Sequence, residues 1–274
     1  MNIKTYIIDA FTQEAFKGNP AGVCLLESEL VPAQMQAIAA EMNHSETAFL
    51  LPSTEMEGEF KIRYFTPTTE IAFCGHATLA SAKLVLEKLN YNNVTFVTGH
   101  NLRLEVSQEH DGRILMHFPM YAPVAKEPIP EVYAALGITE EDCVGTFYAD
   151  PLAMLIVQVK NQKTLLGIKP DYRTLVHDAP FLKGLAVTSP SEDPEFDFNS
   201  RCFWPWVGIN EDPVTGSAHS ALAPFWAFIL GKTELRAYQA STRGGSMDLA
   251  LMPAKNQVEV RSHAQIVLEG VLFL

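Results

Sequence analysis

Two glycine-centred motifs combine polar, chemically reactive side chains with an apolar segment of helical length that follows at once. The first occupies residues 74–78 (CGHAT), and the second occupies residues 211–219 (EDPVTGSAH), roughly half a chain length later. Free backbone N–H groups and the positive end of the helix dipole meet at a helix N-terminus, where they attract anions. Each motif therefore predicts a binding point for a negatively charged group.

Four side chains in or near these motifs could take part in proton transfer, namely Glu46, His76, Asp212 and Ser217. Glu46 lies directly before the apolar run at residues 47–51, where burial of an unpaired charge would be costly. A glutamate works well as a base near neutral pH only when its pKa is raised, and burial has that effect. Each residue alone has a structural explanation, such as a helix cap or a turn. Together they suit proton transfer to and from carbon.

The elements that must position these side chains are short strands alternating with few helices, which indicates an α+β class. Helices are predicted near residues 32–42, 77–86, 129–136 and 217–230. The helix after each glycine is apolar nearly all round, so we expect it to be buried on all sides. Pro224 lies inside the last of them and is expected to kink or shorten it.

The two motifs also suggest an internal duplication. When Gly75 is aligned with Gly216, several small residues of the following helices coincide, and the offset is close to half the chain. We infer two similar halves, each a curved sheet wrapped around one buried helix. The expected domains are residues 1–118 and 119–264, and the two helix N-termini are expected to face a shared cleft, the usual place for a small-molecule site.

Composition narrows the function classes. The chain has 274 residues and a formal net charge of −12 at pH 7, which argues against a nucleic-acid partner because such binding depends on Lys and Arg. No stretch is long and apolar enough to predict a membrane span, and no signal-peptide pattern is visible, so we expect a cytoplasmic protein.

The four cysteines predict neither a metal site nor a disulfide framework. They are widely spaced and contain no CxxC pair: Cys24, Cys74, Cys143 and Cys202. Buried free thiols are the simplest interpretation, although Cys74 stands out because it lies in the first motif.

Seven blocks of the sequence resemble the signature blocks of the phenazine-biosynthesis isomerase (PhzF-like) family. They occur in order at residues 9–12 (DAFT), 16–23 (FKGNPAGV), 45–49 (SETAF), 64–67 (YFTP), 74–78 (CGHAT), 211–219 (EDPVTGSAH) and 243–245 (RGG). The resemblance implies a diaminopimelate-epimerase-like fold of two similar domains, each a barrel-like, mostly antiparallel sheet around a central helix. It also implies that the last strand, about residues 265–274, returns to the N-terminal domain.

The same resemblance implies a cofactor-independent isomerase acting on a small cyclic or conjugated carboxylate, with no metal. The founding enzyme of the family moves a proton between ring carbons of a dihydro-hydroxyanthranilate. By its motif, Glu46 resembles the acid/base, while His76, Asp212 and Ser217 resemble the groups that hold the substrate and assist the transfer. Backbone amides of Gly75, His76, Gly216 and Ser217 would receive the carboxylate. A homodimer is what the family suggests.

Two other functions stay open at this point. An amino-acid racemase or epimerase of this fold uses two cysteines, and Cys74 matches one of them. No cysteine lies between Asn210 and Ser220, so the second base would have to be Asp212. A non-catalytic binding protein on the same fold is the other alternative. Arg201 could pair with a substrate carboxylate or form a structural ion pair, and Arg243 could simply belong to a turn.

Overall fold

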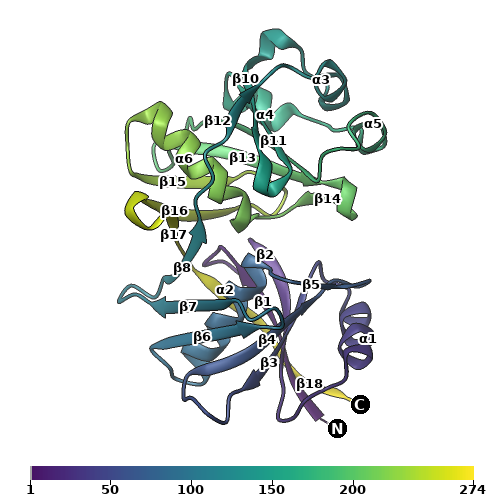
Figure 1. The fold of residues 1–274 in the computed structure, drawn as a ribbon, viewed down its shortest axis with the longest axis vertical. Helices are drawn as coiled ribbons and strands as arrows, with labels where there is room; N and C mark the ends of the chain where they lie inside the picture. Colours follow the sequence, from purple (N-terminus) through teal and green to yellow (C-terminus); the bar gives the residue numbers. More distant parts are fainter. Residues whose placement is uncertain (1) are drawn as a thin grey trace. The chain divides into compact units, whose positions relative to one another are not determined.

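The computed structural model describes residues 2–274, which form two compact units (Figure 1). Unit 1 holds the chain through His117 together with Glu259–Leu274, and unit 2 is Phe118–Val258. The chain therefore re-enters unit 1 at Glu259, six residues before residue 265, where the sequence predicts that the last strand returns to the N-terminal domain. No helix of the described chain is long and apolar enough to cross a membrane.

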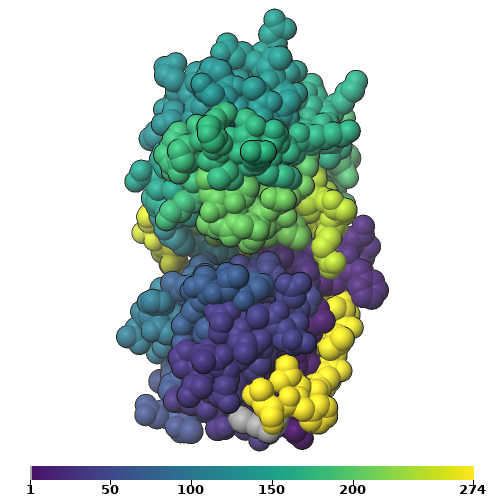
Figure 2. All heavy atoms as spheres, turned by 90° about the vertical axis from the view of Figure 1, so that its right-hand side faces the viewer, coloured from purple at the N-terminus to yellow at the C-terminus, as the bar shows by residue number. Residues whose placement is uncertain are grey.

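Unit 1 is a mixed but mostly antiparallel sheet. Its strands are β1 (Asn2–Ala10), β2 (Asn19–Leu25), β3 (Thr47–Pro52), β4 (Glu59–Phe65), β5 (Glu70–Ile71), β6 (Asn93–Thr98), β7 (Arg103–Gln108), β8 (Ile114–Pro119) and β18 (Ala264–Phe273). Neighbouring strands pair in the order β18-β1-β2-β3-β4-β6-β7-β8, and only β2–β3 and β4–β6 are parallel. The end of β18 lies on the surface, where Phe273 is 78% exposed (Figure 2).

The central helix of unit 1 is α2 (Gly75–Lys83), which a π-helical turn at Leu84–Lys88 continues. Every α2 residue except Lys83 is buried, as its apolar sequence predicts. The helix packs against β1, β2, β3 and β18. Its first turn is tied to the sheet by a buried hydrogen bond of 2.6 Å between the hydroxyls of Thr78 and Tyr64 on β4. A second helix, α1 (Pro32–Met42), precedes β3.

Unit 2 repeats this plan with additional helices. Its strands are β9 (Val124–Lys126), β10 (Cys143–Ala149), β11 (Met154–Val159), β12 (Gly184–Pro190), β13 (Phe198–Trp204), β14 (Ile209–Asp212), β15 (Glu234–Gln239) and β16 (Gly245–Met252), and β17 (Gln257–Ser262) follows at the boundary. Three short helices, α3 (Pro130–Leu136), α4 (Gln162–Gly167) and α5 (Tyr172–Asp178), form a hydrophobic core with β11, β12 and β13. The sequence predicts the first of them and misses the other two.

The central helix of unit 2 is α6 (His219–Leu230), preceded by a 3-10 turn at Gly216–Ala218. Pro224 does not interrupt it as a helical segment. Proline has no N–H to donate to the carbonyl four residues earlier. That carbonyl, on Ser220, instead accepts a 2.8 Å hydrogen bond from the N–H of Tyr121. The proline is therefore tolerated because a neighbouring segment satisfies the freed acceptor.

The prediction that α6 is buried on all sides is wrong at its C-terminal turn. Phe228 is 90% exposed, and Ile229 and Leu230 are also exposed, whereas most residues nearer the N-terminus are buried. Apolar composition indicates that a helix can be buried, but it does not indicate how far the surrounding sheet extends along the helix. The fold class itself, a mostly antiparallel α+β fold with one central helix in each unit, is as predicted.

Candidate active site

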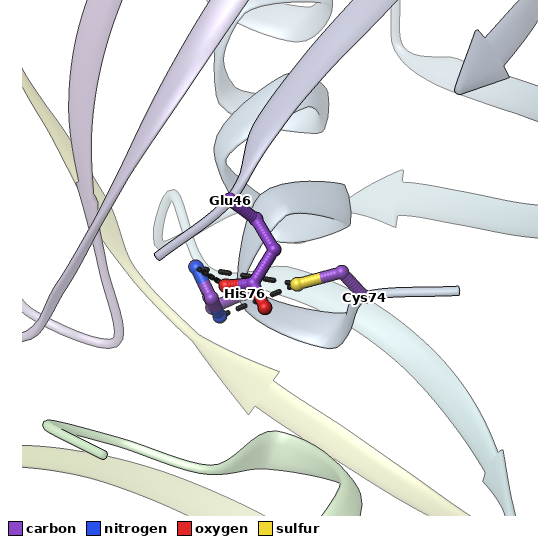
Figure 3. Close-up of side chains that lie close together, drawn as sticks. All are labelled: Glu46, Cys74 and His76. Carbon is purple, nitrogen blue, oxygen red and sulfur yellow. Dashed lines mark hydrogen bonds and ion pairs between the residues drawn. The ribbon is translucent and has the colours of Figure 1, made fainter. Parts of the chain in front are cut away.

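Glu46 is held at the start of β3 by the backbone of the neighbouring strand. Helix α1 ends at Met42, and its C-cap residue Asn43 has the left-handed conformation (φ 50°) that turns the chain towards the sheet. The carbonyl of Glu46 then accepts a 3.1 Å hydrogen bond from the N–H of Gly22 on β2. This anchoring fixes the side chain beside the first turn of α2 (Figure 3).

The carboxyl of Glu46 is buried, with only 7% of the residue exposed. Burial raises its pKa above the ordinary value, and hydrogen bonds with Ser45 and Cys74 offset part of that effect. Its Oε2 lies 3.2 Å from Nε2 of His76, but outside the angles of a hydrogen bond. The carboxyl is therefore biased towards its neutral form, and the imidazole of His76 lies close to it.

His76 occupies the second position of α2 and is held through both ring nitrogens. Its Nδ1 lies 3.2 Å from Nδ2 of Asn19, the first residue of β2, and its Nε2 lies 3.4 Å from Oγ of Ser45. If the Asn19 amide nitrogen donates, Nδ1 must accept, so a neutral imidazole carries its proton on Nε2. That proton would then face Oγ of Ser45.

Cys74 completes a cluster of three reactive side chains. Its Sγ lies 3.4 Å from Nδ1 and 4.0 Å from Nε2 of His76. Among the described residues, Glu46, Cys74 and His76 form a group whose ligand atoms all lie within 4.8 Å of one another, so they could hold a metal ion. Cys74 is also the N-cap of α2, but its side chain makes no capping hydrogen bond.

The second motif is organised differently, around Asp212 at the end of β14. The Thr215 hydroxyl donates a hydrogen bond to the Asp212 carboxylate, and the Thr215 N–H donates to Oε1 of Gln239 over 2.9 Å. Nε2 of Gln239 in turn donates to the Asp212 carbonyl over 2.7 Å. Asp212 is buried, whereas Ser217, in the 3-10 turn that begins at Gly216, is partly exposed.

His219 is the first residue of α6 and is completely buried. Burial lowers its pKa to about 4, and a hydrogen bond with the Thr215 carbonyl, 2.9 Å from Nδ1, opposes this only in part. The histidine is therefore neutral near pH 7, with its proton on Nδ1. It is a structural member of the motif and cannot act as a cationic substrate ligand.

A second thiol, that of Cys202, lies beside Asp212, although the two residues are ten positions apart in the sequence. Cys202 on β13 pairs directly with Asp212 on β14. Its side chain is fully buried, and burial, reinforced by the nearby Asp212 carboxylate, raises the pKa of the thiol. A thiol in this state is a poor base, so Cys202 does not supply the second cysteine of a two-thiol epimerase.

The structure therefore brings Glu46 and His76 into contact within unit 1, and it places Asp212, Gly216 and Ser217 in the second motif of unit 2. Sequence reasoning missed Asn19 and Gln239 as supporting residues. The sequence does indicate that Asn19 is functionally relevant, because it lies in the FKGNPAGV block. Gln239 lies in none of these blocks, and nothing in the sequence indicates its role.

The two arginines left open by the sequence are now partly accounted for. Arg201 forms a bidentate pair with Glu211, at 2.7 and 2.9 Å, and its third nitrogen donates to the carbonyls of Leu165 and Ile168. The guanidinium is thus committed to protein groups. Beside Arg243, Gly244 adopts φ 67° and its N–H donates to Oγ of Ser241, which makes the segment a tight turn.

The family model of phenazine biosynthesis-like proteins (PhzC-PhzF) matches residues 8–270. The chain belongs to this family. Its resemblance to PhzF-like proteins is thereby confirmed over nearly its whole length.

Relatives from distant organisms cover the chain end to end. A human phenazine biosynthesis-like domain-containing protein is 41% identical, with 99% of each chain covered. A protein of Halalkalibacterium halodurans named as an uncharacterized isomerase is 40% identical, with both chains covered completely. The crystal structure of a PhzF-family protein from Enterococcus faecalis superposes with a TM-score of 0.91 at 36% identity, with 100% of both chains covered. These matches confirm the predicted fold, and they confirm an isomerase as the enzyme class.

Proposed function

We propose that the protein is a cofactor-independent isomerase that moves a proton between two carbons of a small cyclic or conjugated carboxylate, with Glu46 as the acid/base. The observation that carries the proposal is the buried Glu46 carboxyl, 3.2 Å from the imidazole of His76. Perturbed carboxyls of this kind are common at catalytic sites because general acid–base catalysis needs a pKa near the working pH.

The reaction divides into two proton transfers. The Glu46 carboxylate takes a proton from one carbon, and the electron pair of that C–H bond moves into the conjugated system. The neutral Glu46 then returns the proton to another carbon, and the carboxylate is regenerated. No oxidant, reductant or second substrate is required.

The remaining groups stabilise the charge between the two steps. Backbone amides at Gly75 and His76, at the N-terminus of α2, are suited to receive an anionic oxygen. His76, with its proton on Nε2, is suited to donate to the substrate. We assign the equivalent substrate-binding role in the second motif to Asp212, Ser217 and the amide of Gly216, as the family motif implies.

An epimerase that uses Cys74 is the second candidate. Its support is the 3.4 Å contact between Cys74 Sγ and Nδ1 of His76, which could accept the thiol proton. Its weakness is the second base, because Cys202 is sealed in the core and only Asp212 remains. Deuterium incorporation from D2O at an amino-acid α-carbon would distinguish this reaction, and its absence across a panel of amino acids would count against it.

Glu46→Gln tests the proposed function with little change in shape. Glu41→Gln is the matched control, since Glu41 is an exposed glutamate on α1. A panel of cyclic and conjugated carboxylates is screened by NMR for isomerisation and for exchange of carbon-bound protons in D2O. We expect Glu46→Gln to lower the rate by about 10²- to 10⁴-fold, the usual contribution of an acid/base, while carboxylate binding persists. Undiminished turnover by Glu46→Gln would reject the assignment.

A further inference from the structure

The cluster of Glu46, Cys74 and His76 also has the chemistry of a transition-metal site. It offers a carboxylate oxygen, a sulfur and an imidazole nitrogen, and these side chains converge on one point (Figure 3). Nε2 of His76 lies 3.2 Å from Oε2 of Glu46 and 4.0 Å from Sγ of Cys74. All three residues are buried, so bulk water competes little for the ligand atoms.

These separations are close to those that a zinc ion imposes on its ligands. Bonds of about 2.0–2.3 Å at tetrahedral angles place neighbouring ligand atoms about 3.3–3.8 Å apart. Small side-chain rotations would bring the three atoms to such distances. Three protein ligands leave the fourth position open, as in zinc sites that also hold a water molecule. Oγ of Ser45, 3.4 Å from Nε2 of His76, borders the cluster.

A second observation points independently to a cation. Oε2 of Glu46 is buried and has no hydrogen-bond partner. The Glu46 side chain is only 10% exposed, so water does not readily replace that partner. In the ionised form of Glu46, a buried carboxylate oxygen without a donor is costly, and a bound cation removes that cost. The same oxygen is the one that faces the imidazole, so its lone pairs are directed into the cluster.

Asn19 is placed to support a metal-bound histidine. With Nε2 bound to a metal, Nδ1 must carry the proton, and metal-bound histidines usually donate this proton to a neighbouring acceptor. The Asn19 side chain lies 3.2 Å from Nδ1. A half-turn of its amide presents oxygen in place of nitrogen. Metal binding therefore reverses the tautomer that suits proton transfer.

We propose that unit 1 binds a thiophilic divalent cation, such as zinc or cobalt, through Cys74, His76 and Glu46, and that the bound ion blocks the acid/base. Thiolate and imidazole ligands select zinc-like ions over magnesium and calcium. On binding, the S–H bond of Cys74 breaks, its proton and any proton on the Glu46 carboxyl pass to solvent, and the His76 proton moves from Nε2 to Nδ1, so that metal–sulfur, metal–oxygen and metal–nitrogen bonds form without any change of oxidation state. Binding therefore strengthens as the pH rises. Metal binding by this cluster does not depend on the proposed function, whereas the inhibitory effect of the bound ion rests on it.

Cobalt(II) is the direct probe, because its absorption reports its ligands. The full chain is treated with a chelator, exchanged into a phosphine reductant and titrated with cobalt chloride at neutral pH. We expect one equivalent to bind, with visible bands of a four-coordinate ion and a near-ultraviolet charge-transfer band from thiolate. Zinc should displace cobalt and abolish both. A wild-type titration without the charge-transfer band would overturn the proposal.

Two cysteine variants locate the site. Cys74→Ser should remove the charge-transfer band and weaken cobalt binding at least tenfold, since even outer-shell partners contribute about 10- to 100-fold. Cys143→Ser is the matched control, because Cys143 is a partly exposed thiol that donates to the Thr139 carbonyl in unit 2. It should bind as the wild type does. A band that survives in Cys74→Ser or disappears in Cys143→Ser contradicts the site.

Glu46→Gln decides the matter if circular dichroism shows that Cys74→Ser is unfolded. It keeps the thiolate, so the charge-transfer band should persist while affinity falls at least about tenfold. Unchanged affinity would overturn the assignment of Glu46 as a ligand. The two proposals fail separately: absence of cobalt binding leaves the proton-transfer test untouched, and cobalt binding together with full turnover by Glu46→Gln rejects only the acid/base role.

Discussion

Replacement of His219 by asparagine tests how burial controls charge in the second motif. His219 is 0% exposed, and its pKa is lowered from 6.5 to about 4, chiefly by burial. Nδ2 of an asparagine reaches nearly the position of Nδ1, so His219→Asn can keep the hydrogen bond to the Thr215 carbonyl. The substitution therefore removes the titration while it retains the contact.

The sign and size of the effect follow from linkage. His219 has a pKa of 6.5 in the unfolded chain and about 4 in the folded protein, so between these values only the unfolded state binds a proton there. The free energy of unfolding therefore falls as the pH falls from 6.5 to about 4. At about 1.36 kcal/mol per pH unit, the loss totals about 3.4 kcal/mol, and about 2.5 kcal/mol of it occurs between pH 7.5 and 4.5. His219→Asn should not show this contribution.

Urea unfolding followed by tryptophan fluorescence reports the stability of unit 2, which contains His219. All three tryptophans, Trp204, Trp206 and Trp226, lie in unit 2, and Trp226 stacks on Phe198 with ring centroids 5.3 Å apart. The stability difference between wild type and His219→Asn should shift by about 2.5 kcal/mol in favour of the variant as the pH falls from 7.5 to 4.5. His177→Asn, at a largely exposed histidine, is the control. A difference that does not change with pH would refute the reasoning.

Two further substitutions probe the supporting residues. Asn19→Leu leaves Nδ1 of His76 without its amide partner. A hydrogen bond is worth about 0.5–1.5 kcal/mol, so we expect kcat to fall by roughly two- to twelvefold with KM little changed. A change confined to KM would contradict a role in setting the tautomer. Gly244→Ala should destabilise unit 2 more than Gly208→Ala, because both glycines have positive φ but only at Gly244 would a Cβ meet a side chain, the Tyr238 hydroxyl at 2.0 Å. The shared backbone cost is about 1–2 kcal/mol, and equal losses in the two variants would show that the contact costs nothing.

Much of the fold could be predicted because local pattern and tertiary structure agree. The helix at Gly75 follows from a run of small and apolar residues, and its burial follows from the near absence of polar ones. Strands such as β6 and β16 were not predicted from the sequence, although Gly99 directly follows the first and Pro253 the second. Helices α4 and α5 are only six and seven residues long, too short for a helical period to stand out.

The site was predictable in its reactive groups but not in their supports. Glu46 and His76 lie in sequence blocks that suggest chemistry, and the structure brings them together. The contact between Gln239 and Asp212 joins two strands far apart in sequence, and Cys202 reaches Asp212 only through the β13–β14 register. Such pairings depend on the arrangement of the sheet, which no local pattern encodes. The homodimer implied by the family stays a prediction.

The titration of Glu46 tests the central claim most directly, and it needs no substrate. Carbon-13 labelling of the glutamate carboxyls allows their pKa values to be followed by NMR, and comparison with Glu46→Gln assigns the resonance of Glu46. Because the carboxyl is buried and hydrogen bonds offset that burial only in part, we predict a pKa above the ordinary 4.5 of a glutamate. A Glu46 pKa at or below 4.5 would contradict the account of this residue as a carboxyl poised for proton transfer.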